Sequence, residues 1–345
     1  MKQLSEEKNM QKIKIGQIGI GHNHGAAKMA TVRKFPELFD VVGYAEENEK
    51  WIEKRGDNPS YQGLLRLSVE EIINRSDAIL LESDVWDLDK YARLCVNAGK
   101  HIHMDKPAGK LGEFKEILDT AKRKKLVFQM AYMYRYNPAV LRCFEHIKNG
   151  DIGEIYSINA EMSTYHSPEY KTWLKNFGGG IMYILGSHLV DLIVYMLGEP
   201  KKVHSFMKRT GLDGVEVEDN NLAVLEYDKA LARVFVSSVE VNGYGRRQLV
   251  VSGSKGTVNI CPLERPMKMT YSDLSIADQH YQDKKIAVDI EDTISSDSRY
   301  DVMMQDFYAY ILGEKQNPFT YEHDYTVQKV IDEIVGGVRF NGKSI

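Results

Sequence analysis

Ile13-Lys14-Ile15-Gly16-Gln17-Ile18 runs directly into Gly19-Ile20-Gly21-His22-Asn23-His24-Gly25 near the start of the chain. The first run is largely apolar and predicts a buried strand, and the glycines after it predict a tight turn into a helix. Glycines let phosphate groups approach the backbone, and the first amides of a helix attract negative charge. The stretch therefore predicts the first turn of a dinucleotide-binding βαβ unit.

This turn departs in one place from the G-x-G-x-x-G arrangement. His24 stands where the third glycine is expected, and Gly25 follows one position later. The third glycine serves close packing of helix on strand, so Gly25 or Ala26 is expected to take that role. His22 and His24 also form an H-x-H pair, but it has no matching acidic or cysteine partner. We interpret both as contacts to cofactor or substrate and expect no metal site.

The composition excludes several classes of function. The chain has 345 residues, a length typical of two domains, and 45 basic against 49 acidic residues. This near balance carries no electrostatic signature of nucleic-acid binding. The longest apolar run, 181–197, is interrupted by Gly186, His188 and Asp191, so we expect no membrane span. Three cysteines without paired spacing, and no signal-peptide pattern, predict a cytoplasmic protein.

Strand and helix patterns alternate through the first part of the chain. Apolar runs predict strands over 12–18, 39–45, 78–81, 100–104 and 126–130. Helical patterns lie between them over 26–34, 48–55, 88–98 and 113–124. Ser68 and Glu71 predict a capping box at the start of one more helix. Such alternation indicates parallel strands with helical crossovers, so we expect a doubly wound sheet of the Rossmann type.

The second part has a different pattern. Strand-like runs follow one another closely over 155–162, 202–208, 221–227, 231–240, 248–252 and 257–260. Helices are expected over 138–149, 180–197, 300–312 and 324–335. Closely spaced strands indicate a mainly antiparallel sheet. We therefore expect a flexible N-terminus over 1–11, a dinucleotide-binding domain over 12–137, and an α+β domain over 138–345 for substrate binding and oligomerisation, with terminal helices able to pack back on the first domain.

Several motifs in a fixed order resemble the Gfo/Idh/MocA family, the group of glucose-fructose oxidoreductase and inositol dehydrogenase. They are the glycine turn, the acidic residues after the second strand, and the runs 98–107, 134–138 and 178–191. The resemblance extends over nearly everything after Gln11. It implies an N-terminal Rossmann domain, and a C-terminal α+β domain with a large, open, mainly antiparallel sheet. It also implies an NAD(P)-dependent dehydrogenase acting on CH–OH groups.

The cofactor is expected to be NAD. A carboxylate at the end of the second strand accepts both ribose hydroxyls of NAD and repels the 2′-phosphate of NADP. Glu46 stands there with Glu47 beside it, although two glutamates also suit the start of a helix. NADP stays an alternative cofactor, because Lys50, Lys54 and Arg55 lie nearby in the sequence. The resemblance implies further cofactor contacts at Gly19, Ile20, Gly21, His22, Asn23, His24, Glu82, Asp105, Lys106 and Pro107.

The resemblance assigns the proton chemistry to Lys106 and His188. Oxidation of a secondary alcohol needs a group that takes the hydroxyl proton while hydride leaves, and a lysine can do so when nearby positive charge lowers its pKa. Both residues are also expected to contact substrate. A surface lysine and a core histidine are the structural alternatives. Further substrate contacts, or aromatic walls, are expected from Tyr134, Arg135, Tyr165, His166 and Tyr183.

One position departs from the family pattern. Ile184 stands where the family has an aspartate, four residues before His188 and on the same helical face. Isoleucine can neither accept a proton nor orient an imidazole, so one participant in the proton relay is missing. Asp191 lies near that face and could bond the ring, but we interpret it as structural.

The resulting hypothesis is an oxidoreductase that moves hydride between a sugar or cyclic polyol carbon and nicotinamide. Two alternatives stay open: an NAD-dependent enzyme that cleaves glycosides through transient oxidation, and an NAD-binding protein that has lost turnover. A sheet with helices on one face must cover its other face, so we expect a homodimer or homotetramer. The segments 231–240 and 244–248 are the surfaces expected to form it.

Overall fold

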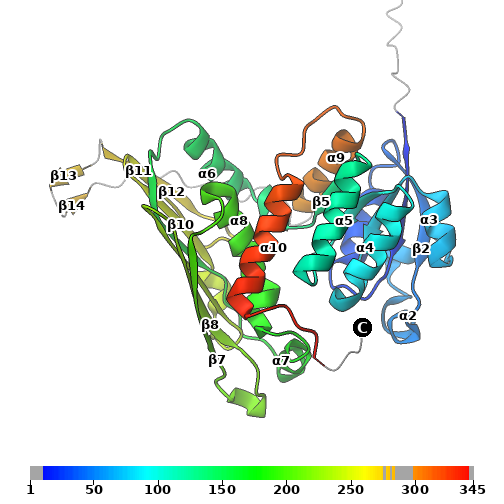
Figure 1. The fold of residues 1–345 in the computed structure, drawn as a ribbon, viewed down its shortest axis with the longest axis horizontal. Helices are drawn as coiled ribbons and strands as arrows, with labels where there is room; N and C mark the ends of the chain where they lie inside the picture. Colours follow the sequence, from blue (N-terminus) through cyan, green and yellow to red (C-terminus); the bar gives the residue numbers. More distant parts are fainter. Residues whose placement is uncertain (1–10, 275–276, 280–281, 284–297, 342–345) are drawn as a thin grey trace, which may run out of the picture. The chain divides into compact units, whose positions relative to one another are not determined.

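The structure is a computed structural model that describes residues 11–274, 277–279, 282–283 and 298–341 (Figure 1). The chain forms two compact units. The first comprises residues up to 105, 116–131 and 300–318, and the second comprises 106–115, 132–299 and 319 onward. Of the N-terminal segment expected to be flexible, only Gln11 lies within the described residues.

The first unit is built on a five-stranded parallel sheet. Its strands are β1 (Ile13–Ile18), β2 (Phe39–Ala45), β3 (Ala78–Leu81), β4 (His101–Met104) and β5 (Phe128–Met130), in the order β2-β1-β3-β4-β5. The connecting helices are α1 (Gly25–Arg33), α2 (Glu49–Arg55), α3 (Val69–Arg75), α4 (Leu88–Asn97) and α5 (Leu111–Arg123). The expected doubly wound sheet is confirmed.

Local sequence explains these elements. Every residue of β3 is buried, as expected of a central parallel strand covered on both faces. At the start of α3, Oγ of Ser68 accepts from the amide of Glu71, and the Glu71 carboxylate accepts from the amide of Ser68. The predicted capping box is therefore present and fixes where the helix begins.

The second unit contains a seven-stranded mixed sheet. Its strands are β6 (Ile155–Glu161), β7 (Lys202–Lys208), β8 (Asn220–Glu226), β9 (Leu231–Ser237), β10 (Gln248–Gly253), β11 (Gly256–Ile260) and β12 (Met269–Asp273). The order is β12-β11-β10-β6-β9-β8-β7, and only the β6–β9 pair is parallel. A further short hairpin pairs β13 (Ala277–Gln279) with β14 (Gln282–Asp283).

Helices cover one face of this sheet (Figure 1). They are α6 (Pro138–Lys148), α8 (Ser187–Leu197) and α10 (Tyr321–Val335), while α7 (Pro168–Leu174) lies in the connection after β6. Strands β8 and β10 alternate strictly between buried and half-buried residues, so one face packs and the other stays partly open. The expected mainly antiparallel α+β architecture is confirmed.

The helix expected over 180–197 is divided. A π-helical turn occupies Met182–Gly186, and the regular helix α8 begins at Ser187. Turns of this kind shift the backbone ladder by one residue and often mark functional sites. The irregularity involves Ile184, the position where the sequence departs from the family pattern.

The two units do not divide at residue 137 as expected. The second unit already includes residues 132–137, and two other segments also lie in the unit that chain order would not assign to them. Residues 106–115 belong to the second unit, where the carbonyl of Ala108 accepts from Oη of Tyr183 at 2.5 Å and from Nε2 of Gln328 at 3.0 Å. Most of α9 (Ser298–Ile311) belongs to the first unit, where the carbonyl of Met303 accepts from Gln129 at 3.2 Å. Chain order alone does not reveal such exchanges, because they depend on contacts between distant residues.

Candidate active site

A pocket of about 370 Å³ lies in the first unit, where β1 and β2 end. Gly19, Glu46 and Asn48 line it together with Asp84 and Tyr91. In parallel α/β sheets, ligands bind outside the carboxyl ends of the strands, next to the first glycine turn. The pocket therefore occupies the place that the sequence predicts for a dinucleotide.

The glycines of the turn are required by their surroundings. Gly19 has a φ of +88°, and a Cβ added to it would lie 2.3 Å from the backbone of Ser83. A Cβ on Gly21 would lie 2.6 Å from Nε1 of Trp51, which donates to Asp84 at 2.7 Å. A Cβ on Gly25 would approach Glu82 Cβ to 3.2 Å, so close helix packing falls to this glycine. Any side chain at the first two positions would push the turn out of place.

Glu46 lies at the edge of the pocket, as the sequence predicts. Its carboxylate accepts from the amide of Ile20 at 2.8 Å and from the amide of Asn48 at 2.8 Å. Burial raises the pKa of Glu46, and these two amide hydrogen bonds oppose the rise. The carboxylate therefore joins the glycine turn to the end of β2.

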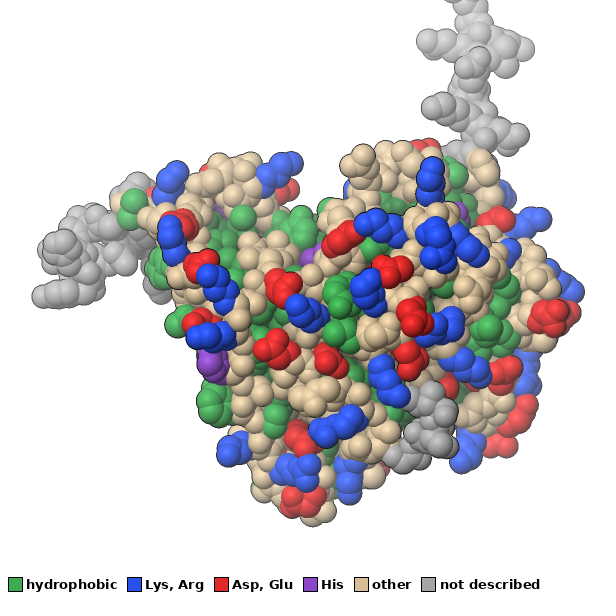
Figure 2. All heavy atoms as spheres, viewed as in Figure 1, with side chains coloured by type: hydrophobic (Ala, Val, Ile, Leu, Met, Phe, Trp, Pro, Cys, Tyr) green, Lys and Arg blue, Asp and Glu red, His purple; other side chains and the backbone are tan. Residues whose placement is uncertain are grey.

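Arg55, one of the cations that left NADP open, is bound to the glycine turn. Its guanidinium donates to the carbonyl oxygens of Ile20 at 3.2 Å and His22 at 2.5 Å, and to Oδ1 of Asn23 at 2.7 Å. These three hydrogen bonds to backbone and amide oxygens explain the position of Arg55 without a role in binding the 2′-phosphate of NADP. On the face shown in Figure 2, basic and acidic side chains are interspersed.

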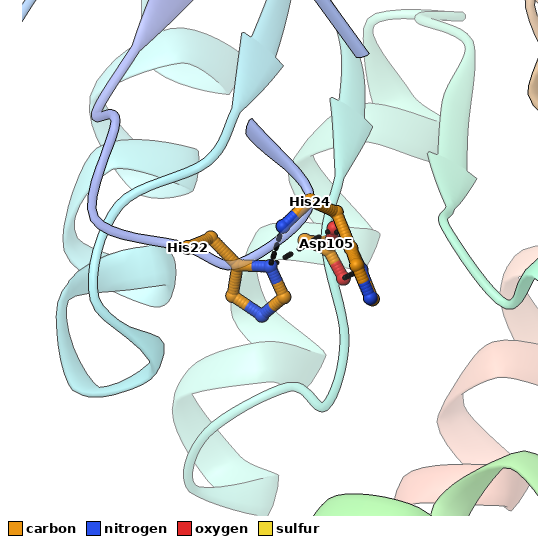
Figure 3. A group of neighbouring side chains, drawn as sticks. All are labelled: His22, His24 and Asp105. Carbon is orange, nitrogen blue, oxygen red and sulfur yellow. Dashed lines mark hydrogen bonds and ion pairs between the residues drawn. The ribbon is translucent and has the colours of Figure 1, made fainter. Parts of the chain in front are cut away.

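His22, His24 and Asp105 come together at the carboxyl ends of β1 and β4 (Figure 3). Nδ1 of His22 lies 3.2 Å from Oδ2 of Asp105, and Nδ1 of His24 lies 3.0 Å from the same oxygen. Asp105 is completely buried. The sequence did not show this carboxylate as a partner of the histidines, because it stands 81 residues after His24.

A buried chain of polar groups continues from Asp105 into the first unit. Nζ of Lys28 lies 3.3 Å from Asp105, 3.3 Å from Glu82 and 2.8 Å from Nε2 of His103. Nδ1 of His103 lies 2.7 Å from Oε1 of Gln129. Since an amide oxygen only accepts, His103 carries its proton on Nδ1 and accepts from Lys28 through Nε2.

The charged groups in this hydrogen-bonded cluster shift one another's pKa values. Burial raises the pKa of Asp105, but His22, Lys28 and His24 outweigh it, and the pKa lies well below its ordinary value. Burial raises the pKa of Glu82 well above its ordinary value, with Lys28 opposing and Asp105 adding to the rise. Burial, followed by Lys28, lowers the pKa of His103. Asp105 thus holds the negative charge of the cluster.

Lys106 begins the second unit and is not a surface lysine, since only 4% of it is exposed. Its Nζ donates to the carbonyl oxygen of Ile184 at 3.0 Å. The π-helical turn contains this residue, and Ser187 Oγ donates to the same carbonyl at 3.2 Å. The position that lacks a carboxylate side chain therefore supplies an oxygen acceptor from its main chain. Pro107, next in the chain, is buried.

His188 is 2% exposed and packs edge-on against the rings of Tyr132 and Tyr134, with centroids 5.8 Å and 4.9 Å away. Asp191 faces elsewhere: it accepts from Arg135 Nη2 at 2.6 Å and lies 2.9 Å from Nε2 of His323. Its carboxylate therefore connects α8 to α10 and to the segment after β5, which agrees with the interpretation of Asp191 as a structural residue.

The remaining expected substrate contacts are placed unequally. Arg135 is 1% exposed and pairs with Asp191 and Asp324, so the geometry does not support a substrate contact for its guanidinium. Tyr134 is also buried and hydrogen-bonds Glu264. Tyr165, in contrast, is 54% exposed. His166 is half-buried and stacks on the ring of Tyr170. Tyr183 donates to the backbone at Ala108.

Sequence reasoning missed several residues of these sites. Lys28 and His103 were assigned only to a helix and a strand, although each interrupts an apolar pattern in an element that should be buried. That interruption is the signal that could have found them, because buried charges need partners. The main-chain role of Ile184 has no sequence signal at all.

Comparison with known proteins identifies relatives across most of the chain. The model of the GFO/IDH/MocA C-terminal domain matches residues 140–259. An uncharacterised oxidoreductase of Schizosaccharomyces pombe is 30% identical over 253 residues, which cover 68% of each chain. Levoglucosan dehydrogenase of Pseudarthrobacter phenanthrenivorans is 25% identical over 295 residues, 72% of this chain and 73% of the relative.

The fold has the same relatives among solved structures. A levoglucosan dehydrogenase in complex with NADH and levoglucosan superimposes with a TM-score of 0.80 at 20% identity, over 94% of this chain and 97% of the other. Among the described residues, no helix combines the length and the apolar composition needed to cross a bilayer.

Proposed function

Because the chain belongs to the Gfo/Idh/MocA family of oxidoreductases, we propose that it is a dehydrogenase that oxidises a ring hydroxyl of a sugar or cyclic polyol with NAD. The family and the dehydrogenase class expected from the sequence agree with the relatives. The substrate class and the choice of NAD are our proposal. Its main support is the hydrogen bond from Lys106 to Ile184, which holds the expected proton-handling group in place without the aspartate.

The first unit fits the nucleotide half of this proposal. The glycine turn cannot carry side chains at Gly19 and Gly21, so a pyrophosphate could approach its backbone closely. Glu46, Glu47, Glu49, Asp84 and Asp87 line the pocket, against one lysine, Lys90. Such an acidic wall accepts ribose hydroxyls and repels a 2′-phosphate, so it favours NAD over NADP.

The second unit fits the proton half. NAD, when bound, would supply the acceptor for a hydride from the substrate carbon, which would become a carbonyl as the hydroxyl proton leaves. Lys106 handles that proton, and Ile184 holds its Nζ by accepting one of its N–H groups. His188, held by two tyrosine rings, is the second group proposed to share the proton. Tyr165 is the exposed aromatic group proposed to contact a sugar ring.

The test follows the absorbance of reduced nicotinamide while the protein is offered NAD or NADP with inositols, aldoses and glycosides. The Lys106→Met variant should lose about 10²–10⁴-fold in kcat/KM, the usual contribution of a positioned proton-transfer group. Lys110→Met is the matched control, because Lys110 is an exposed lysine four residues later. Equal activity of both variants would contradict the role of Lys106.

The same assay separates the alternatives. Monosaccharide release from a glycoside without net cofactor reduction would favour the glycoside-cleaving enzyme. Binding of NAD without either reaction would favour a protein that has lost turnover. Ile184→Asp gives a further distinction: a large gain in activity indicates a decayed site, whereas a loss indicates that the main-chain arrangement is the working one.

Oligomerisation is proposed to use the open face of the second sheet. Two apolar side chains on this face are more than half exposed: Phe206 on β7 at 55% and Leu231 on β9 at 56%. Exposed apolar side chains on one face favour burial against another chain. Sedimentation of the wild type and of Phe206→Glu checks this, since a smaller species is expected for the variant.

A further inference from the structure

We infer that His22, His24 and Asp105 bind one divalent transition-metal ion in the first unit. The expectation of no metal site rested on the lack of an acidic partner for the H-x-H pair. The fold supplies that partner at the end of β4 (Figure 3). The three ligand atoms, Nδ1 of each histidine and a carboxylate oxygen, all lie within 4.8 Å of one another.

Their spacing suits a common ion. Ligand atoms about 2.1 Å from one ion are about 3.0 Å apart at octahedral angles and about 3.4 Å apart at tetrahedral angles. The two histidine nitrogens lie 3.2 Å and 3.0 Å from Oδ2 of Asp105. Nδ1 of His22 also lies 3.4 Å from the amide of His24, a weak contact that an ion at Nδ1 would replace. The three ligand atoms are therefore close enough together to share one ion.

Glu82 supplies an independent observation. It is completely buried, and when it is ionised its Oε2 has no hydrogen-bond donor among the described residues. A buried carboxylate oxygen in this state is costly unless a cation or a proton meets it. Oε2 lies 3.8 Å from Nδ1 of His22, which places it beside the three ligands as a fourth oxygen.

Lys28 is not the cation that meets Oε2 of Glu82, because its Nζ lies next to the other oxygen, Oε1. Its single charge is shared between Glu82 and Asp105 at 3.3 Å each, and its third contact is His103. With neutral imidazoles and both carboxylates ionised, one ammonium leaves one negative charge, which either a proton on Glu82 or a metal ion balances. Two imidazoles with carboxylate oxygens suit Zn²⁺, Co²⁺ or Ni²⁺ better than Mg²⁺ or Ca²⁺, which prefer oxygen ligands alone.

The ion would tie the glycine turn to the end of β4, directly before Lys106. This role is structural and is separate from the hydride transfer proposed above. It is also distinct from a simple hydrogen-bonded cluster, in which the same histidines only donate protons to Asp105. The two arrangements differ in one measurable respect, the stoichiometric binding of a metal.

The experiment uses the full chain after removal of any affinity tag and treatment with a chelator. Co²⁺ is added and followed by its visible absorption bands, and Zn²⁺ is added in a calorimeter. We expect about one ion per chain for the wild type, and at least about a tenfold weaker affinity for the His22→Asn/His24→Asn double variant. His146→Asn is the matched control, since Nδ1 of His146 lies 2.8 Å from Asp151 in another His–Asp pair.

Three results would overturn the inference: no saturable binding by the wild type, equal binding by the double variant, or equal loss in His146→Asn. Circular dichroism reports whether the double variant folds. If it does not fold, thermal unfolding of the wild type with and without Zn²⁺ decides, because an ion that binds the native state raises Tm. An unchanged Tm at saturating Zn²⁺ would then contradict the site. NAD binding is measured on the same samples, so failure of the metal site is distinguishable from failure of the proposed enzyme.

Discussion

Two buried clusters of histidine and carboxylate side chains stabilise the two units, and a different cation fills each. In the first unit, Lys28 faces Asp105 and Glu82. In the second, the guanidinium of Arg135 bonds Asp191 through Nε and Nη2 and also reaches Asp324 at 2.6 Å. A guanidinium presents five donors in a planar fork, whereas an ammonium is a compact point charge. The first cluster therefore leaves Oε2 of Glu82 without a donor among the described residues, as an oxygen that a proton or a cation can meet.

The second cluster is also closed by aromatic rings. The guanidinium carbon of Arg135 lies 4.0 Å from the ring centre of Phe319 and 5.0 Å from that of Tyr132. Asp324 keeps one oxygen, Oδ2, without a hydrogen-bond partner in the described part of the chain. That oxygen lies in a group already paired with a permanent positive charge, so a metal ion is not favoured there. Similar residue types thus produce a structural ion pair in one unit and a candidate ligand site in the other.

The largest effect is expected from Arg135→Met. Removing the guanidinium leaves Asp191 and Asp324 buried without their main partner, which should lower the free energy of unfolding by about 4–5 kcal/mol. Urea denaturation followed by circular dichroism measures it. Arg135→Lys should recover only part of the loss, because one ammonium cannot bond both carboxylates in the same way. A loss below about 1 kcal/mol in Arg135→Met would show that this ion pair is not structural.

Lys28→Met should cost somewhat less, about 3 kcal/mol, because Glu82 can take up a proton when the lysine is removed. The comparison predicts a different response to metal. Zn²⁺ should restore much of the stability of Lys28→Met by replacing the lost positive charge, and it should not restore Arg135→Met. Thermal unfolding with and without Zn²⁺ checks both variants. Equal rescue of the two variants would remove the distinction between the clusters.

A smaller effect is expected from His323→Phe. Nε2 of His323 lies 2.9 Å from Oδ1 of Asp191, but Arg135 still bonds that carboxylate after the substitution. The loss of one hydrogen bond should lower the free energy of unfolding by about 1–2 kcal/mol. Urea denaturation at neutral pH tests this. A loss as large as that of Arg135→Met would mean that the histidine is an equal partner.

The smallest effect concerns a histidine next to a cation rather than a carboxylate. Burial and the nearby Arg247 lower the pKa of His166 to about 4. Below an unfolded-state pKa of about 6.5, the unfolded chain takes up a proton that the folded chain refuses, so this contribution is present above pH 6.5 and is lost as pH falls toward 4. His166→Phe keeps the stacking on Tyr170 without the titration. Between pH 7.5 and 5, the wild type should lose on the order of 1 kcal/mol more stability than the variant. Parallel losses in urea denaturation would exclude this role of His166.

The elements that sequence patterns predict well are those with local causes. The bounds of β2, β3 and β7 agree with the apolar runs, and the capping box at Ser68 depends on a residue three positions away. The strand β12 and the helix α7 were not predicted. The helix over 180–197 was predicted as one element, since nothing in its apolar pattern reveals a π-helical turn.

The candidate sites divide in the same way. Glu46 and the glycine turn follow from a local motif, and the structure brings them together at Ile20. The partnership of His22 with Asp105 depends on two strands that become neighbours of the same sheet edge only after folding. Asp191 and Arg135 are likewise joined across 56 positions of the chain. Distances in the chain therefore conceal the contacts that decide the charge of each cluster.

The hydrogen bond between Lys106 and the carbonyl of Ile184 has a consequence for how sequences of this kind are classified. A peptide oxygen is present whatever side chain the residue carries, so no substitution at 184 short of a change in backbone path can remove this acceptor. The position is therefore free to vary in side chain while its bond to the lysine persists. A sequence filter that retains only chains with an acidic residue at position 184 would classify this protein as inactive. The main-chain oxygen that accepts the hydrogen bond from Lys106 is nevertheless present.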